Sequence, residues 1–293
     1  MKIRQHFVSS LVAPGLLAMI AGCSGSSGGG GGSSGTPGFS LGNIVGGRTG
    51  QYLDAGATFA SAESVTEEKQ DELGKAVAIA ATNRWPLFDR PALTKYLSMV
   101  GLAVAAESSN PDGNWVFGVL DTPDVNAFSG PNGYIMVTRG AIAAMEDESE
   151  LAGVLAHEIA HIVNRDGLEA IKSAKRNEAI MKGLSAGEQK FAMFNQLTGN
   201  LIEKTLNSGY SRDQETAADS KGLKLLIAAG YDPNGLVKFL KHLQERKAGT
   251  GKLFSTHPAT ADRIAKLTAQ IGSAKPGATN KERFTQAAAE AKL

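Results

Sequence analysis

Hydrophobic and polar residues follow one another along most of this chain with the period of an α-helix. Apolar side chains recur three and four positions apart in six segments, which predicts helices over residues 64–83, 91–106, 147–162, 191–205, 215–227 and 259–271. The first segment opens with Ser64 and Glu67 at capping-box spacing, and the third opens with Asp147 and Glu150. Each apolar stripe covers one side of its helix, so we expect the helices to pack around a shared core.

Between the second and third helices the pattern changes to short β-rich runs. Residues 115–120 form one predicted strand, and a Pro-Asn-Gly turn at 131–133 is followed by another up to Thr138. These runs predict a short antiparallel sheet, and therefore a mostly helical α+β fold. The exposed edge of such a sheet could hold a peptide as an added strand, and core strands would have the same pattern. The residues assigned to this substrate-binding edge are Asn126, Ala127, Phe128, Gly133 and Tyr134.

The third predicted helix contains His157-Glu158-Ile-Ala-His161, an H-E-x-x-H motif. Two imidazoles four residues apart lie on one face of a helix, one turn from each other, where a single metal ion can contact both. Glu158 projects beside that position, where it can take a proton from a water on the metal. The chain has only five histidines, so an ordinary amphipathic helix with two histidines by chance is the weaker interpretation.

A catalytic zinc ion needs a third protein ligand, and a downstream acid is the best candidate. The longer metzincin motif is excluded because Asn164 and Gly167 stand where it requires glycine and histidine. Glu215 and Asp219 share one face of the fifth predicted helix, which suits a ligand and a partner for a ligating histidine. A solvated acidic first turn is the alternative interpretation of this pair.

Three blocks of the sequence together resemble metallopeptidase family forty-eight, which includes prenyl-protein endopeptidase, HtpX and BepA-like peptidases. The blocks begin at His157, Tyr210 and Ser255, and the resemblance extends over residues 62–271. It implies a small gluzincin-type fold with one zinc ion bound by His157, His161 and Glu215. It also implies that Glu158 is the general base. Asp219 would not bind the metal itself but would accept a hydrogen bond from a ligating histidine.

The resemblance suggests roles for three further residues. His257, before a proline, matches a family histidine that can occupy the open zinc position, although the local sequence would equally suit an exposed histidine. Arg263 matches an arginine that could contact substrate or the transition state, and a surface salt bridge is the alternative. Tyr210 could donate a hydrogen bond to the reacting oxygen, or could simply pack.

The N-terminal residues have the pattern of a secretory signal. Lys2 and Arg4 precede an apolar run that ends in Ile-Ala-Gly-Cys23, which resembles a bacterial lipobox with Cys23 as the lipidated residue. The run is short and broken by Pro-Gly, which disfavours a transmembrane helix. This predicts a lipid-anchored envelope protein. By the same resemblance the periplasmic face of the outer membrane is favoured, because Cys23 is followed by Ser24 and not by the aspartate that is associated with retention in the inner membrane.

Composition sets the domain organisation and the range of partners. We expect a signal peptide at 1–22, a lipidated cysteine and Gly/Ser-rich linker at 23–58, a peptidase domain at 59–271 and a C-terminal tail at 272–293. The net charge of +1 disfavours nucleic acid as a partner and leaves protein or peptide substrates. The repeats of larger relatives have no counterpart, so any substrate-selecting adaptor would be a separate protein.

Together these patterns predict zinc-dependent hydrolysis of peptide bonds in misfolded or unassembled envelope proteins. Two alternatives remain open: a zinc-binding, chaperone-like protein without activity, and a structural lipoprotein whose metal only stabilises the fold. Glu158 argues against the first, because a silent domain has no chemical need for a base. A structural zinc site would have all four positions filled, so the role of His257 decides the second.

Overall fold

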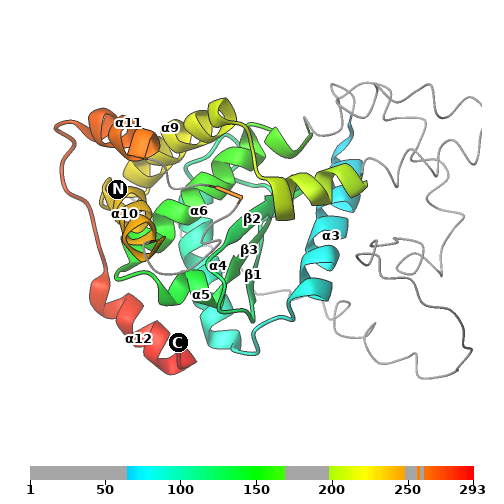
Figure 1. The fold of residues 1–293 in the computed structure, drawn as a ribbon, viewed down its shortest axis with the longest axis horizontal. Helices are drawn as coiled ribbons and strands as arrows, with labels where there is room; N and C mark the ends of the chain where they lie inside the picture. Colours follow the sequence, from blue (N-terminus) through cyan, green and yellow to red (C-terminus); the bar gives the residue numbers. More distant parts are fainter. Residues whose placement is uncertain (1–64, 169–197, 248–255, 258–260) are drawn as a thin grey trace, which may run out of the picture. The chain divides into compact units, whose positions relative to one another are not determined.

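The computed structural model describes residues 65–168, 198–247, 256–257 and 261–293. These residues form the predicted α+β fold, mostly helical with a small three-stranded sheet (Figure 1). The helices are α3 (Glu67–Arg84), α4 (Pro91–Ala105), α5 (Arg139–Ala143), α6 (Glu148–Val163), α9 (Arg212–Ala228), α10 (Gly235–Lys247), α11 (Ala261–Ile271) and α12 (Lys281–Ala291). The strands are β1 (Val116–Leu120), β2 (Ala127–Gly130) and β3 (Tyr134–Thr138), with single turns η3 (Pro131–Gly133) and η5 (Lys204–Ser208).

Most helices begin where the sequence predicts them, with two corrections at the caps. Thr66 caps α3 by accepting a hydrogen bond from the Lys69 amide, so this helix begins at Glu67; the predicted cap, Ser64, lies outside the described residues. Helix α9 begins three residues before Glu215, because Ser211 and Gln214 form a reciprocal capping box. Of the helix predicted over 191–205, the part before residue 198 lies outside the described residues.

Three of the described helices were not predicted: the short helix α5, and the longer helices α10 and α12. Helix α10 follows a turn at Asp232 and buries an apolar stripe in the core. Helix α12 falls in the segment assigned as a tail, yet it buries Phe284 against the core. Its sequence is rich in alanine with few large apolar residues, so its helical period is weak in the sequence.

The sheet is mixed rather than antiparallel, which corrects the prediction. The strand order is β1-β3-β2, and β1 runs parallel to β3 with Phe117 opposite Ile135. Strands β2 and β3 form an antiparallel hairpin whose turn places Asn132 at φ 59° and Gly133 at φ 93°. The chain reaches the far edge of the sheet with β2 and returns through the centre with β3, so β2 is an edge strand and β3 is not.

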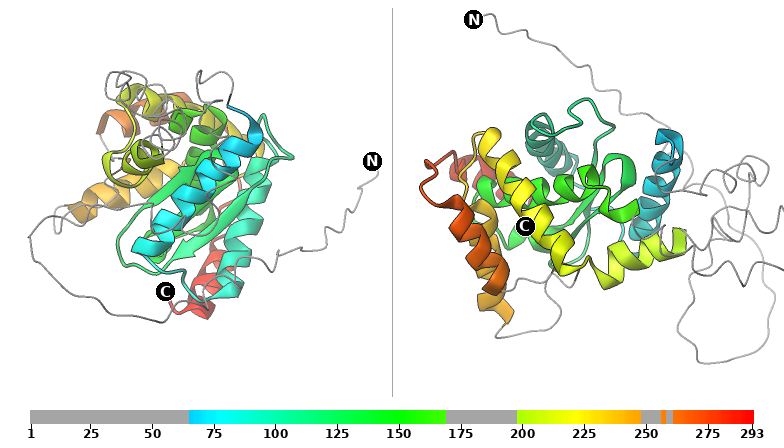
Figure 2. Two further views of the ribbon diagram at one scale, coloured as in Figure 1. Left: turned by 90° about the vertical axis from the view of Figure 1, so that its right-hand side faces the viewer. Right: turned by 90° about the horizontal axis from the view of Figure 1, so that it is seen from above.

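The two faces of the sheet pack against different helices (Figure 2). Ile135 and Val137 of β3 belong to the main core with α4 and α6, whereas Met136 packs with Phe128 against α3. The same alternation along β2 directs Ala127 to the main core and Phe128 to the α3 side. Ser129 therefore faces α6, the helix that carries the H-E-x-x-H motif.

Glycines allow two helices to lie very close to α6. A Cβ atom on Gly153 of α6 would lie 2.6 Å from the backbone nitrogen of Leu236 in α10. A Cβ atom on Gly222 of α9 would lie 3.1 Å from the backbone of Ala156 and His157. The backbone positions of the motif are thus fixed by direct contact with neighbouring helices.

A buried carboxylate, Glu148, holds the C-terminal segment against the start of α6. Its side chain accepts hydrogen bonds from Tyr96 Oη at 2.6 Å, Tyr231 Oη at 2.8 Å and Asn280 Nδ2 at 3.0 Å. Arg283 of α12 donates to both carboxylate oxygens through Nε and Nη2. One charged group at the base of α6 thereby connects α4, α12 and the turn before α10.

Candidate metal centre

Helix α6 brings the three motif residues together in the interior of the domain. Asp147 caps the helix as predicted, by accepting a hydrogen bond from the Glu150 amide. His157 and His161 are each 1 % exposed, and their Nε2 atoms lie 3.1 Å apart. The two imidazoles therefore present a pair of nitrogen donors to one point, as their spacing predicts.

Glu215 of α9 faces the two histidines. One carboxylate oxygen lies 3.5 Å from His157 Nε2 and the other lies 3.5 Å from His161 Nε2. Glu215 and Asp219 are each 3 % exposed. The alternative interpretation of this pair as a solvated first turn is therefore wrong.

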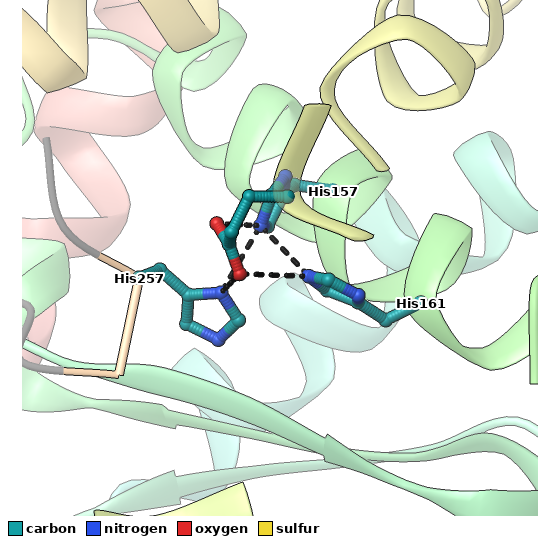
Figure 3. A group of neighbouring side chains, drawn as sticks. His157, His161 and His257 are labelled. Atoms are coloured by element: carbon teal, nitrogen blue, oxygen red, sulfur yellow. Dashed lines mark hydrogen bonds and ion pairs between the residues drawn. The ribbon is translucent and has the colours of Figure 1, made fainter. Parts of the chain in front are cut away.

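His257 points into the same centre from a segment outside the helices and strands (Figure 3). Its Nδ1 atom lies 2.8 Å from Glu215 Oε1 and 3.2 Å from His157 Nε2. The residue is 1 % exposed, so the exposed alternative is excluded. Thr256, the residue before His257, lies directly against Gly209, which has a φ of 72°. A Cβ atom on Gly209 would lie 2.0 Å from the Thr256 carbonyl oxygen, so this position requires glycine.

The donor set fits a zinc ion. Ligand atoms about 2.0–2.2 Å from a tetrahedral ion lie roughly 3.3 Å apart. The neighbouring nitrogen and oxygen atoms of His157, His161, Glu215 and His257 lie 2.8–3.5 Å apart. Two imidazoles and a carboxylate are also a ligand combination that suits this metal.

Each helical histidine has a carboxylate on its other ring nitrogen. Asp219 Oδ1 lies 3.0 Å from His157 Nδ1, in agreement with its predicted supporting position. Asp166 Oδ2 lies 2.7 Å from His161 Nδ1, a contact that the sequence analysis missed. Such carboxylates fix the ring orientation and keep Nε2 free to bind a metal. Asp166 follows Arg165, whose φ of 62° turns the chain back toward the histidine after α6 ends.

Arg263 binds the carboxylates of Asp219 and Glu215. Its Nε and Nη2 atoms bind Asp219 at 2.8 and 2.7 Å, and Nη1 lies 2.9 Å from Glu215 Oε2. The side chain is buried, so the alternative of a surface salt bridge is wrong. All three guanidinium nitrogens contact the acids around the metal site, which makes Arg263 a positioning residue.

The charges in the centre attract a cation. Burial opposes protonation of His157, but Asp219 and Glu215 outweigh it and raise the pKa of His157 to about 9. Burial likewise opposes ionisation of the acids, yet the histidines lower the pKa of Glu215, and Arg263 and His157 lower that of Asp219 to about 2. Both acids are thus ionised, and a bound divalent ion would satisfy them.

Glu158 lies beside the donor set and is not part of it. Its Oε2 atom accepts a hydrogen bond from Ser129 Oγ at 2.8 Å, which fixes the carboxylate relative to β2. Its Oε1 atom is buried without a hydrogen-bond partner and lies 3.5 Å from His257 Nε2. A base needs a free oxygen close to the reacting position, and Oε1 is unpaired and lies beside a residue of the donor set. Ser129 was not among the residues predicted from the sequence.

Tyr210 stacks on the ring of His161, with ring centroids 4.2 Å apart. Burial raises the pKa of the Tyr210 hydroxyl, and the charge of Glu158 raises it further. The group therefore remains a protonated donor beside the centre. A small cavity next to it is lined by Ser129, Pro131, His161 and Leu168, among other residues.

The structure separates the residues assigned to the substrate-binding edge. Ala127 and Phe128 lie on the edge strand β2, next to Asn126, whose side-chain oxygen accepts from the Ala127 amide and from Thr256 Oγ1. Gly133 belongs to the turn and Tyr134 begins the central strand, where it donates to Asp71. These two residues do not lie on an edge strand, so their assignment is wrong.

Cys23, the predicted lipidation site, lies outside the described residues, as does the predicted signal peptide. Within the described ranges, no helix has both the length and the apolar character that crossing a bilayer requires.

Comparison with known proteins places this site in a defined family. The model of peptidase family M48 matches residues 91–271, a range that includes the H-E-x-x-H helix, Glu215 and His257. The chain is 32 % identical to metalloprotease YcaL of Escherichia coli K12 over 186 residues, which cover 62 % of this chain and 72 % of that protein. It is 34 % identical to the mitochondrial metalloendopeptidase OMA1 of Schizosaccharomyces pombe, with 59 % of this chain and 52 % of the relative covered.

A third relative is the beta-barrel assembly-enhancing protease of Escherichia coli K12, at 24 % identity over 76 % of this chain and 47 % of the relative. The chain thus spans about half the length of this protein and of the yeast relative. The family match covers more than half of the chain, and the site has the geometry that the family resemblance implied. The chain belongs to peptidase family M48.

Proposed function

We propose that this protein is a zinc-dependent metalloendopeptidase that hydrolyses peptide bonds of protein substrates. The observation that carries the proposal is the relation of Glu158 to the donor set. His157, His161 and Glu215 converge on one point, while Glu158 has a buried oxygen without a hydrogen-bond partner beside it. A site that only stabilised the fold would not need this carboxylate.

The chemistry follows from the positions of the side chains. A zinc ion held by the three ligands would acidify a water molecule and polarise the scissile carbonyl. Glu158 takes the proton from the attacking water and later delivers it to the leaving amine, while Ser129 holds the carboxylate in place. Asp166 and Asp219 keep the two imidazoles oriented, and the Tyr210 hydroxyl is a candidate donor to the developing oxyanion.

His257 acts in this proposal as a removable fourth donor. It fills the position that a water or a substrate carbonyl would need. A peptide that pairs with the edge of β2 would pass the site where Thr256 now contacts Asn126. Displacement of the Thr256–His257 segment would therefore open both the metal position and the strand edge.

For the natural context we propose misfolded or unassembled proteins of the bacterial envelope as substrates. The lipobox-like sequence ending in Cys23 supports a lipid anchor, with the periplasmic face of the outer membrane as the location. A relative named for enhancing β-barrel assembly supports a quality-control role. A separate adaptor protein could select the substrates.

The deciding experiment compares the wild-type protein with Glu158→Gln and with Glu107→Gln, an exposed control. Each is assayed for zinc content and for cleavage of an unfolded test protein. We expect Glu158→Gln to retain one equivalent of zinc and to lose cleavage, with the control unchanged. Undiminished cleavage by Glu158→Gln would refute the mechanism, and no cleavage by any of the proteins would favour the chaperone-like alternative.

A further inference from the structure

A second group of metal-ligating side chains lies at the opposite end of α6. Glu146 precedes the helix, Glu150 lies in its first turn, and His242 reaches the same place from α10. His242 Nδ1 lies 3.2 Å from Glu150 Oε2, and His242 Nε2 lies 3.7 Å from Glu146 Oε1. One candidate ligand atom from each of the three residues lies within 4.8 Å of the others.

The second observation is a buried, unpaired oxygen on Glu150. The residue is 0 % exposed, and its Oε1 atom has no hydrogen-bond partner. Leaving such a buried acceptor unpaired costs about 1–3 kcal/mol. Burial, assisted by the charge of Asp147, raises the pKa of Glu150 to about 8.

The charged neighbours do not compensate Glu150. The ammonium group of Lys238, whose charge acts on Glu150, binds Asp232 at 2.7 Å and Asp147 at 3.4 Å. His242 contacts only Oε2 of Glu150 and is itself shared with Glu146. The buried oxygen Oε1 is therefore a possible metal ligand for which the described side chains supply no hydrogen-bond partner.

The cluster is open on the side from which an ion would enter. The side chain of Glu146 is 64 % exposed and that of His242 is 24 % exposed, whereas Glu150 closes the inner end. Glu146 can rotate to complete a ligand set of one imidazole and two carboxylates, a combination that binds zinc-like divalent ions. We propose that Glu146, Glu150 and His242 form a second divalent-cation site, separate from the catalytic centre.

Such an ion would tie the start of the catalytic helix to α10. Glu150 precedes His157 by seven residues, which is two turns or about 10 Å along the same side of α6. The two helices already touch at Gly153, between these two positions. The second ion would act as a structural clamp on the helix that carries the catalytic histidines, and it would not take part in the reaction.

The test measures zinc binding by the full chain when the catalytic site is disabled. In the His157→Ala/His161→Ala background, titration calorimetry with Zn²⁺ should find one remaining equivalent, and added Zn²⁺ should raise the Tm. Adding His242→Ala should abolish both the heat of binding and the Tm shift. Adding Glu245→Gln instead, an exposed charge on the same helix, should leave both intact.

If circular dichroism shows that the background variant is unfolded, a companion measurement uses proteins with an intact catalytic centre. The wild-type protein should then bind two equivalents of Zn²⁺ and Glu150→Gln only one. The proposal is overturned if the folded background variant binds no zinc, if its His242→Ala form binds as before, or if wild type and Glu150→Gln bind equally. A loss confined to this second equivalent leaves the proposed peptidase function untouched.

Discussion

Replacing Glu148 with glutamine should destabilise the protein strongly, although the side chain keeps its shape. Oε2 accepts hydrogen bonds from Tyr96 and from Arg283 Nε, and Oε1 accepts from Tyr231, Asn280 and Arg283 Nη2. A glutamine amide turns one of these oxygens into a donor. In either orientation its NH₂ group faces an N–H of Arg283 and a tyrosine hydroxyl.

The magnitude follows from which groups remain buried after the change. One buried tyrosine hydroxyl must turn or lose its partner, at about 1–3 kcal/mol, and the charge-assisted bonds of Arg283 are worth about 1.5–3 kcal/mol. The Arg283 side chain is 55 % exposed and regains water, so its share lies at the low end. We expect a total loss of about 2–4 kcal/mol, a large part of the roughly 5–15 kcal/mol typical of a domain.

Urea unfolding of wild type, Glu148→Gln and the exposed control Glu282→Gln measures this loss. The control lies on α12 next to Arg283 and should change the free energy of unfolding by less than about 0.5 kcal/mol. A loss below about 0.5 kcal/mol for Glu148→Gln would refute the role of Glu148 as the anchor.

The difference in unfolding free energy between wild type and Glu148→Gln should also depend on pH. Burial opposes ionisation of Glu148, but hydrogen bonds from Arg283, Tyr96, Tyr231 and Asn280 outweigh it and lower its pKa below the ordinary 4.5. A lowered pKa in the folded state means stabilisation that is complete above the unfolded pKa and is lost as the pH falls through the folded one. The difference between wild type and Glu148→Gln should therefore be full at pH 7 and shrink below about pH 4.5. A difference that stays constant under acid would contradict this.

Three further changes test the metal centre and the packing around it. Asp219→Asn should weaken zinc binding about 10–100-fold in competition with a chelator, since it removes a carboxylate that orients a ligand; unchanged affinity would contradict that role. Gly153→Ala should cost about 1–3 kcal/mol in urea unfolding because its Cβ would lie 2.6 Å from a backbone nitrogen of α10, whereas Gly199→Ala, with open space around it, should cost nothing. His257→Ala should leave the circular dichroism spectrum intact and speed cleavage of an unfolded test protein; unfolding would instead indicate a closed structural site.

Local patterns in the sequence predict the parts of the site that lie on one helix. The spacing of His157, Glu158 and His161 fixes their geometry once the segment is helical, and Asp147 marks where that helix starts. Glu215 and Asp219 are recognisable for the same reason, as two acids one turn apart. Each of these inferences needs only the period of a helix.

The contacts that the sequence did not predict join segments distant along the chain. Ser129 reaches Glu158 because β2 pairs with β3 and presents that side chain to α6, and no local pattern encodes this pairing. The direction of β1 could not be inferred either, since strands of either orientation share the alternating pattern. Asp166 is the exception, because an acid just after the motif helix, five residues from His161, is a signal that could have been read.

The arrangement of α6 and α9 bears on which donor could leave the proposed metal centre. Glu215, Asp219 and Gly222 are spaced four and three residues apart on α9, so the ligand, its supporting acid and the glycine of closest approach share one helix face. That face lies against the backbone of His157, and moving Glu215 would require separating two packed helices. His257 lies outside every described helix and strand, so its displacement breaks contacts of its own segment and leaves the helix pair intact. Under the proposed function, this packing leaves His257 as the donor that can be displaced, so the rate of cleavage should depend on how readily the Thr256–His257 segment moves.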